Sequence, residues 1–361
     1  MKPVYGIDFG GTWIRMGEVE ISTGSLTGLA AAKVCDIPDG DISRWVLSNL
    51  DRERTQDVGV AAAGVVDETS LTIHRRYMIL TLARNLSNAG LNVALTNDVQ
   101  AAALAATTYG EAKGLEHVVL ATYSTGFNAA KIVNGRVVTE AEFGHQMHYS
   151  NLIHQFLGDC YITVLPCDSC GGNNHLETFA SANGAALMAR AFLDFRGCRL
   201  SENWMVTMSF LDHNRELEKE GGKVHEHWEL GYPELYSKIV DLIKPEHVYE
   251  AVSINRNELP QKSIYDVQAE AIAASFGRIV AAYNPVQMIL MMGGLTNVKG
   301  LFESAKDEYE KRLGDFQARL LGTPKIVKTQ LQWPGVQGAA LYSFHKMHNI
   351  PLGENVLLIS N

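Results

Sequence analysis

Apolar runs that end in a glycine or polar residue recur along the first third of the chain. Three of them are the run at 4–7 before Asp8, the run at 58–63 before Gly64, and the run at 93–95 before Asn97-Asp98. An alanine-rich stretch at 99–107, with high helix propensity, follows the last one. Strands that end in polar residues and precede helices are typical of an α/β sheet, whose ligands bind at the carboxyl edge. We also expect a strand at 28–32 and a helix at 42–50.

A similar pattern begins again at residue 117. The apolar run 117–122 leads into Tyr123-Ser124-Thr125-Gly126, and a further strand ends at the hairpin signal Asn134-Gly135. This internal duplication predicts two related halves that face each other across a cleft. We place an N-terminal α/β domain at 1–118 and a C-terminal α/β domain at 119–361.

The later segments complete the second predicted domain. A polar stretch at about 196–232 is typical of an exposed insertion. The remaining expected elements are a long helix at 263–283, a buried strand at 286–292 that ends at a glycine pair, and a helix at 336–345.

Composition narrows the class of protein. The 361 residues suffice for about two domains, and a net charge of −9 argues against a nucleic-acid partner, which requires clustered Lys and Arg. No run approaches the ~18–20 apolar residues of a membrane span. The chain starts almost at once with its first strand, without a signal peptide, and its five cysteines are mostly scattered. We therefore expect a cytoplasmic protein with no membrane partner.

The first turn carries candidate chemistry for a phosphate. Gly10 and Gly11 allow the backbone N–H groups to approach a ligand closely, and Thr12 adds a hydroxyl donor. Asp8 beside them suits Mg²⁺ on a polyphosphate. An ordinary β-hairpin is the alternative interpretation.

Two polar clusters are candidates for catalysis and sugar binding. Asp98 lies where a strand stops and a helix starts, so it is either a base that takes a proton from a hydroxyl or a plain helix cap. Glu142 and His145 flank a glycine and offer an acceptor and a donor to sugar hydroxyls, unless they lie in a surface loop.

A third cluster has the spacing of a metal site. Cys167 and Cys170 form a C-x-x-C turn, and His175 follows five residues later, with His145 as the fourth ligand of a closed Cys₂His₂ zinc site. The alternative is a redox pair. Such a metal would hold Glu177 rigidly, so that it serves the same pocket as Glu142.

Taken together, these motifs resemble the ROK family of repressors and sugar kinases, in the actin-like ATPase superfamily. The resemblance covers nearly the whole chain except the insertion. It is carried, in family order, by Asp8-x-Gly10-Gly11-Thr12-x-x-Arg15, Ala63-Gly64, Asn97-Asp98-x-x-Ala101-Ala102, Glu142-x-Gly144-His145, the Cys/His loop before Leu176-Glu177, and Gly293-Gly294.

The resemblance implies two actin-like α/β domains with ATP and a hexose between them, and a homodimer or homotetramer. It implies that Asp98 is the base for the 6-hydroxyl. The implied sugar contacts are Gly64, Asn97, Glu142, His145 and Glu177. The implied Mg²⁺ and phosphate contacts are Asp8, Gly10, Gly11, Thr12, Thr125 and Gly126, and Gly293 and Gly294 would face the adenosine.

Two loops depart from the family pattern. In the zinc loop, Cys167 lies one residue farther from Cys170 than the family's spacing, and His175 replaces a cysteine. In the second phosphate loop, Ser124 and Asn128 stand where the family has glycines. We expect a zinc site of altered composition and a reshaped phosphate site.

The leading hypothesis is an ATP-dependent hexose kinase. The loop at Ala63-Gly64, where the family carries Pro-Gly, and the loop from Cys167 to Asn174 also depart from the glucokinase-like pattern. These two altered loops favour an N-acetylhexosamine, N-acetylmannosamine first, with glucose as in a glucokinase close behind. A sugar-responsive regulator would carry an N-terminal helix-turn-helix domain ahead of the first strand. A non-kinase ATPase of the superfamily would turn over ATP without sugar.

Overall fold

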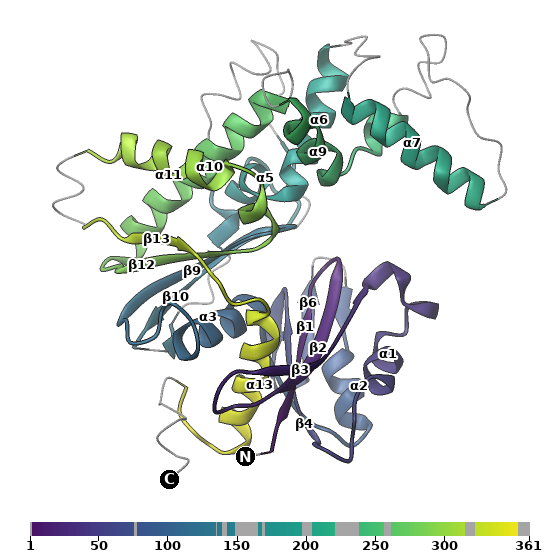
Figure 1. Cartoon of the computed structure of the whole chain (residues 1–361), viewed down its shortest axis with the longest axis vertical. Helices are drawn as coiled ribbons and strands as arrows, with labels where there is room; N and C mark the ends of the chain where they lie inside the picture. Colours follow the sequence, from purple (N-terminus) through teal and green to yellow (C-terminus); the bar gives the residue numbers. More distant parts are fainter. Residues whose placement is uncertain are drawn as a thin grey trace.

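The computed structural model describes residues 2–75, 78–134, 136–138, 143–148, 165–167, 170–196, 204–220, 238–255, 261–314 and 322–352. Within these residues the chain forms two units, each built on a five-stranded mixed sheet (Figure 1). None of the described helices has the length and hydropathy needed to cross a membrane.

The first sheet has the order β3-β2-β1-β4-β8. Its strands are β1 (Val4–Phe9), β2 (Trp13–Val19), β3 (Leu26–Lys33), β4 (Asp57–Ala62) and β8 (Asn92–Asn97). The first three strands pair antiparallel, and β4 and β8 add on in parallel. Buried β-branched and aliphatic residues of these strands form its core, as the apolar runs predict.

The second sheet repeats this plan in the order β11-β10-β9-β12-β13. Its strands are β9 (His117–Tyr123), β10 (Phe127–Val133), β11 (Arg136–Val137), β12 (Met288–Met292) and β13 (Lys325–Lys328). Again an antiparallel meander is followed by two parallel strands. The matching order and pairing confirm the predicted two-unit α/β fold.

Helices cover both sheets, and a third, three-stranded sheet sits on the first unit. This small sheet contains β5 (Val65–Asp67), β6 (Thr72–Arg75) and β7 (Met78–Leu80). The helices are α1 (Ile42–Ser48), α2 (Leu82–Asn88), α3 (Asp98–Thr108), α5 (Leu176–Ala180), α6 (Ala182–Arg196), α7 (Trp204–Lys219), α9 (Pro245–Asn255), α10 (Gln261–Tyr283), α11 (Leu301–Arg312) and α13 (Pro334–Met347).

Helix α13, near the end of the chain, packs against the first unit rather than the second (Figure 1). Its backbone lies so close to β1 and β4 that a Cβ on Gly6 or Gly59 would come within 1.9 Å or 1.8 Å of its carbonyl oxygens. The predicted division at residue 118 places this helix in the second domain. In the structure the chain crosses back, and its last described helix completes the first unit.

The prediction of an exposed insertion at about 196–232 is wrong for its central part. Helix α7 occupies 204–219 and buries Met205, Val206 and Phe210 in the core of the second unit. These apolar residues lie in the first half of the helix, and its charged residues, all within 212–219, are half-buried or exposed. Residues 197–203 and 221–232 lie outside the described residues.

Candidate active site

A cleft of about 920 Å³ lies between the two units. The carboxyl ends of strands from both sheets open into it, where ligands of α/β sheets bind. It is lined by the predicted residues Asp8, Gly10, Gly11, Thr12, Gly64, Asn97, Asp98, Thr125, Gly126, His145, Glu177, Gly293 and Gly294. The predicted sugar ligand Glu142 lies outside the described residues.

Asp8 is a partly buried carboxylate at the end of β1. Burial and the neighbouring charge of Asp98 together raise its pKa to about 6, against the lowering effect of Arg15. Nη1 of Arg15 lies 3.5 Å from Oδ2 of Asp8. The Arg15 guanidinium stands 5.6 Å and 5.4 Å from the ring centres of Trp13 and Trp333, which hold it beside the carboxylate.

The two predicted phosphate loops face each other across the cleft. In the first, the Gly10 N–H donates to the Trp13 carbonyl at 2.9 Å and closes the turn. In the second, the Ser124 N–H donates to the Gly126 carbonyl at 2.9 Å. The hydroxyl oxygens of Thr12 and Thr125 lie 3.5 Å apart, so both loops present a hydroxyl to the same space.

Asp98 is the first residue of α3, and Asn97 is the helix cap. Oδ1 of Asn97 accepts from the Val99 N–H at 2.9 Å, and its Nδ2 donates to the Gly64 carbonyl at 3.1 Å. A helix cap is the alternative interpretation of Asp98, and in the structure Asn97 is the capping residue. Asp98 Oδ1 also accepts from the Val99 N–H at 2.9 Å. Asn97 fixes both Asp98 and Gly64 at the cleft.

The departures in the second loop have a structural use. Between Ser124 and Asn128, the Phe127 ring is buried in the core and stacks on Tyr123 with ring centres 4.7 Å apart. Oδ1 of Asn128 accepts from the Phe143 N–H at 3.0 Å. This bond ties the second loop to the segment that carries His145.

The four predicted zinc ligands converge. His145, Cys167, Cys170 and His175 place their donor atoms within 4.8 Å of one another. Nδ1 of His175 is 3.3 Å from both Nδ1 of His145 and Sγ of Cys170, and Sγ of Cys167 is 3.7 Å from Nδ1 of His145. Zinc–ligand bonds of about 2.0–2.3 Å imply edges of about 3.3–3.8 Å in a tetrahedron.

The chemistry of this Cys/His cluster also fits a metal. Burial and the nearby His145 charge lower the pKa of His175, which favours the neutral ring that binds metal ions. The left-handed backbone of Gly171 and Asn174 turns the loop so that its side chains converge. The cluster is consistent with a zinc site.

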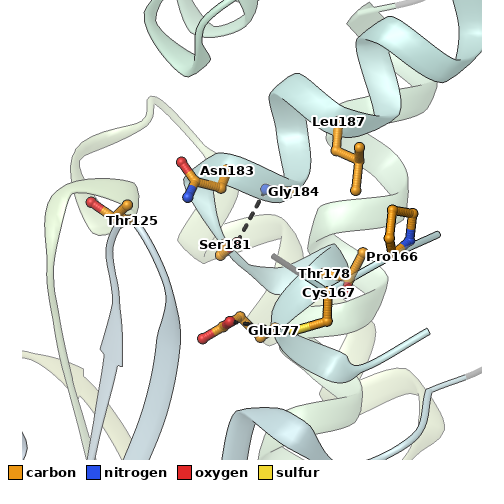
Figure 2. A pocket seen from close by; sticks show the side chains of 9 residues that line it. All are labelled: Thr125, Pro166, Cys167, Glu177, Thr178, Ser181, Asn183, Gly184 and Leu187. Carbon is orange, nitrogen blue, oxygen red and sulfur yellow. Dashed lines mark hydrogen bonds between the residues drawn. The ribbon is translucent and has the colours of Figure 1, made fainter. Parts of the chain in front are cut away.

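Glu177 connects the Cys/His cluster to the second loop. Its Oε2 accepts from the Phe127 N–H at 3.2 Å, and its Oε1 accepts from the Cys167 thiol at 3.7 Å. Figure 2 shows Glu177 beside Cys167, with Thr125 across a small pocket of about 20 Å³. The sequence predicts a sugar contact at Glu177 but not this contact with the loop.

The glycine pair after β12 forms the far end of the cleft. Gly293 has φ +105°, and a Cβ there would lie 2.2 Å from the Tyr123 carbonyl oxygen, so a side chain is excluded. Pro245, Glu246 and Tyr249 of α9 also line the cleft. The sequence analysis does not predict these residues. The available signal is a proline, typical of the first turn of a helix, followed by apolar residues at helical spacing just after the polar stretch.

Comparison with known proteins identifies the family. Residues 4–345 match the model of the ROK family. The chain belongs to the ROK family. Among curated ROK-like relatives, the polyphosphate glucokinase of Mycobacterium tuberculosis is 36% identical over 161 residues, covering 39% of this chain and 57% of that protein. The matched part of this ROK chain thus spans little more than half the length of such relatives.

Solved structures share the ROK fold over nearly the full chain. The ROK hexokinase from Thermus thermophilus has a TM-score of 0.63 at 18% identity and covers 96% of this chain and 99% of that one. The ROK glucokinase from Streptomyces griseus, in complex with glucose and AMPPNP, has a TM-score of 0.63 at 20% identity, covering 94% and 98%. At these identities the likeness shows the fold alone.

Proposed function

We propose that this ROK protein is an ATP-dependent hexose kinase in which Asp98 is the general base. The observation that carries the proposal is the position of Asp98. It opens α3 at the wall of a cleft that both phosphate loops and the carboxylate of Asp8 also line. A carboxylate placed in this way suits transfer of a phosphoryl group to a hydroxyl.

The reaction follows from the residues around the cleft. Asp98 accepts the proton of the sugar 6-hydroxyl as that oxygen forms its bond to the γ-phosphorus, and the bond from the γ-phosphorus to the bridging oxygen breaks to release ADP. Thr12 and Thr125 donate hydrogen bonds to phosphate oxygens from opposite sides. Asp8 is the proposed ligand of Mg²⁺, which neutralises phosphate charge when bound. Closure of the cleft on sugar would exclude water as a competing acceptor.

The sugar is proposed to lie between the Gly64–Asn97 pair and the segment with His145 and Glu177. We include Glu142 among the sugar ligands on the family pattern. Zinc in the Cys/His cluster is proposed to be structural, because four protein ligands leave no open position for catalysis. Its effect on the reaction would pass through Glu177, whose carboxylate contacts Cys167.

The choice of sugar and donor is the finer part of the proposal. The relatives named polyphosphate glucokinase favour glucose over the N-acetylmannosamine to which the altered loops point. The names of these relatives also make polyphosphate a candidate phosphoryl donor. However, Arg15 is the one Lys or Arg among the described residues that line the cleft, against the carboxylates Asp8, Asp98, Glu177 and Glu246. This charge balance favours a Mg²⁺-bound nucleotide over a long polyanion.

A donor and acceptor panel tests the proposal. ADP release is measured with Mg-ATP and no sugar, glucose, mannose, N-acetylglucosamine, N-acetylmannosamine or fructose. With polyphosphate in place of ATP, the glucose 6-phosphate formed is measured instead. The proposal predicts ADP release only with a hexose present. Equal ADP release with and without sugar would instead indicate a non-kinase ATPase, and sugar binding without turnover would favour a sugar sensor.

A further inference from the structure

The small pocket of Figure 2 lies beside the cleft, between the second phosphate loop, α5 and the start of α6. Its volume of about 20 Å³ is enough for one ligand of the size of a water molecule. Thr125 and Glu177 line both the pocket and the cleft, whereas the polar residues Thr178, Ser181 and Asn183 line the pocket alone. A ligand in this pocket would therefore lie next to the proposed phosphate and sugar contacts without occupying their places.

Thr178 supplies a buried oxygen that lacks a partner. The residue is 4% exposed, and its Oγ1 is a buried atom with no hydrogen-bond partner in the described part of the chain. Helical threonines can satisfy this oxygen within their own helix, as Thr107 does by donating to the Ala103 carbonyl at 3.1 Å. Because buried polar atoms are nearly always paired, the Thr178 hydroxyl indicates a ligand in the pocket that it lines.

Backbone contacts fix the walls of the pocket. Helix α6 lies so close to α5 that a Cβ on Gly184 would come within 2.0 Å of the Thr178 carbonyl oxygen. The Gly184 N–H donates to Oγ of the buried Ser181 at 3.1 Å, and the Asn183 N–H donates to the Thr125 carbonyl at 3.3 Å. The pocket therefore has its shape before a ligand binds, as a selective site requires.

The polar groups around the pocket favour a cation. Five of the residues that line it carry side-chain oxygens, which belong to three hydroxyls, one carboxylate and one amide: Thr125, Thr178, Ser181, Glu177 and Asn183. Hard cations prefer oxygen ligands of these kinds. No Lys, Arg or His is among the described residues that line the pocket. An anion would therefore meet a carboxylate there without a cationic side chain to balance it.

Size and charge select among cations. Mg²⁺ dehydrates reluctantly and keeps several waters, for which a pocket of this volume has no room. K⁺ is close to water in size and exchanges its hydration shell for protein oxygens more readily. A positive ion here also offsets the carboxylates of Asp8 and Asp98 in the adjoining cleft, where Arg15 is the one Lys or Arg among the described lining residues.

We propose that the pocket binds a potassium ion through the oxygens of Thr178, Ser181 and Glu177, against the hydroxyl of Thr125. A cation at the Thr125 oxygen would make its hydrogen a stronger donor to the phosphate in the proposed reaction. This effect on turnover rests on the proposed kinase function. Binding of the ion does not, because it follows from the pocket and is measurable without turnover.

Thermal unfolding of the full chain tests the binding. Melting temperatures are compared in the chlorides of K⁺, Na⁺ and N-methylglucamine at equal ionic strength, for the wild type, Thr178→Val and Thr107→Val. Thr107→Val is the matched control, because the Thr107 hydroxyl donates only to carbonyls of its own helix. Relative to N-methylglucamine, K⁺ should raise the melting temperature of the wild type and of the control by several degrees and leave that of Thr178→Val unchanged.

The sign of the effect of Thr178→Val separates a bound ion from a pocket without one. If the hydroxyl has no ligand, its replacement by a methyl group should leave the melting temperature unchanged or raise it equally in every salt. A wild-type melting temperature that is the same in all three salts, an equal rise with Na⁺, or a rise with K⁺ that persists in Thr178→Val would overturn the inference.

Turnover gives a second readout. With Mg-ATP and glucose, kcat/KM of the wild type should be about tenfold higher in K⁺ than in N-methylglucamine, and that of Thr178→Val should be equal in both salts. Turnover of the wild type that is independent of the cation would overturn the proposed effect on the phosphate loop. Absence of turnover in every salt would count against the kinase function, while the melting temperatures would still decide whether K⁺ binds.

Discussion

Replacing Asp8 by Asn should make the protein more stable at neutral pH and inactive. We propose that the carboxylate binds a metal-bound phosphate. In the free protein its charge is unfavourable, because burial and the Asp98 charge raise its pKa from 3.8 to about 6. An acid whose folded pKa is raised contributes stability below pH 3.8 and loses it as the pH rises through about 6.

The size of the effect follows from these two pKa values. Ionisation of Asp8 costs the folded state about 1.6 kcal/mol at pH 5 and about 3 kcal/mol at pH 8. The lowering effect of the Arg15 contact is already contained in the pKa of about 6, so its loss in Asp8→Asn adds no separate pH-dependent contribution. The stability gained by the variant should therefore be about 1.4 kcal/mol larger at pH 8 than at pH 5.

Urea unfolding of the wild type and Asp8→Asn at pH 5 and pH 8 measures this difference. Asp39→Asn is the matched control, because the Asp39 side chain is 83% exposed and makes only a 4.0 Å ion pair. A gain for Asp8→Asn that is the same at both pH values, or that is matched by the control, would refute the reasoning about the buried carboxylate.

Three further substitutions test other parts of the site. Gly293→Ala should lower the free energy of unfolding, measured by urea denaturation, by more than about 3 kcal/mol, because φ of Gly293 is +105° and a Cβ there would overlap a carbonyl oxygen. Gly294→Ala is the control and should change the free energy of unfolding little, because a Cβ on Gly294 meets open space. Cys170→Ser should lose about one zinc per chain, measured by atomic emission, and should have a lower melting temperature. Substitution of the exposed Cys35 by Ser should change neither quantity. Wild-type protein without zinc would contradict the metal site. Asn128→Ala should raise the sugar KM several-fold in steady-state assays while the ATP KM changes little, because its side chain holds the segment with the proposed sugar ligand His145; equal changes in both would count against this role.

The elements that the sequence predicted well are those in which a local pattern and the final packing agree. The apolar run before Asp8, the run before Asn97 and the alanine-rich stretch after Asp98 became β1, β8 and α3. Their polar ends met at one cleft, because parallel strands share a carboxyl edge. The cysteines and histidines of the predicted metal site likewise place four donor atoms together, although they are spread along the chain from His145 to His175.

The features that were missed depend on contacts between distant segments. Helix α13 completes the first unit only because glycines on β1 and β4 allow its backbone to approach, and no local pattern shows that pairing. The acceptor role of Asn128 depends on the position of the Phe143 N–H, fifteen residues away. Helix α7 was misread because its polar face dominates the composition of the segment.

The central claim, that Asp98 accepts the proton of a hexose hydroxyl, is tested most directly by comparing the wild type with Asp98→Asn. Hexose 6-phosphate and ADP are measured together under saturating Mg-ATP and glucose, and calorimetry measures sugar affinity. We expect equal amounts of both products from the wild type, and a variant that binds glucose normally but turns over about 10²–10⁴ times more slowly. Near-normal turnover by Asp98→Asn, or ADP release without hexose phosphate, would contradict it.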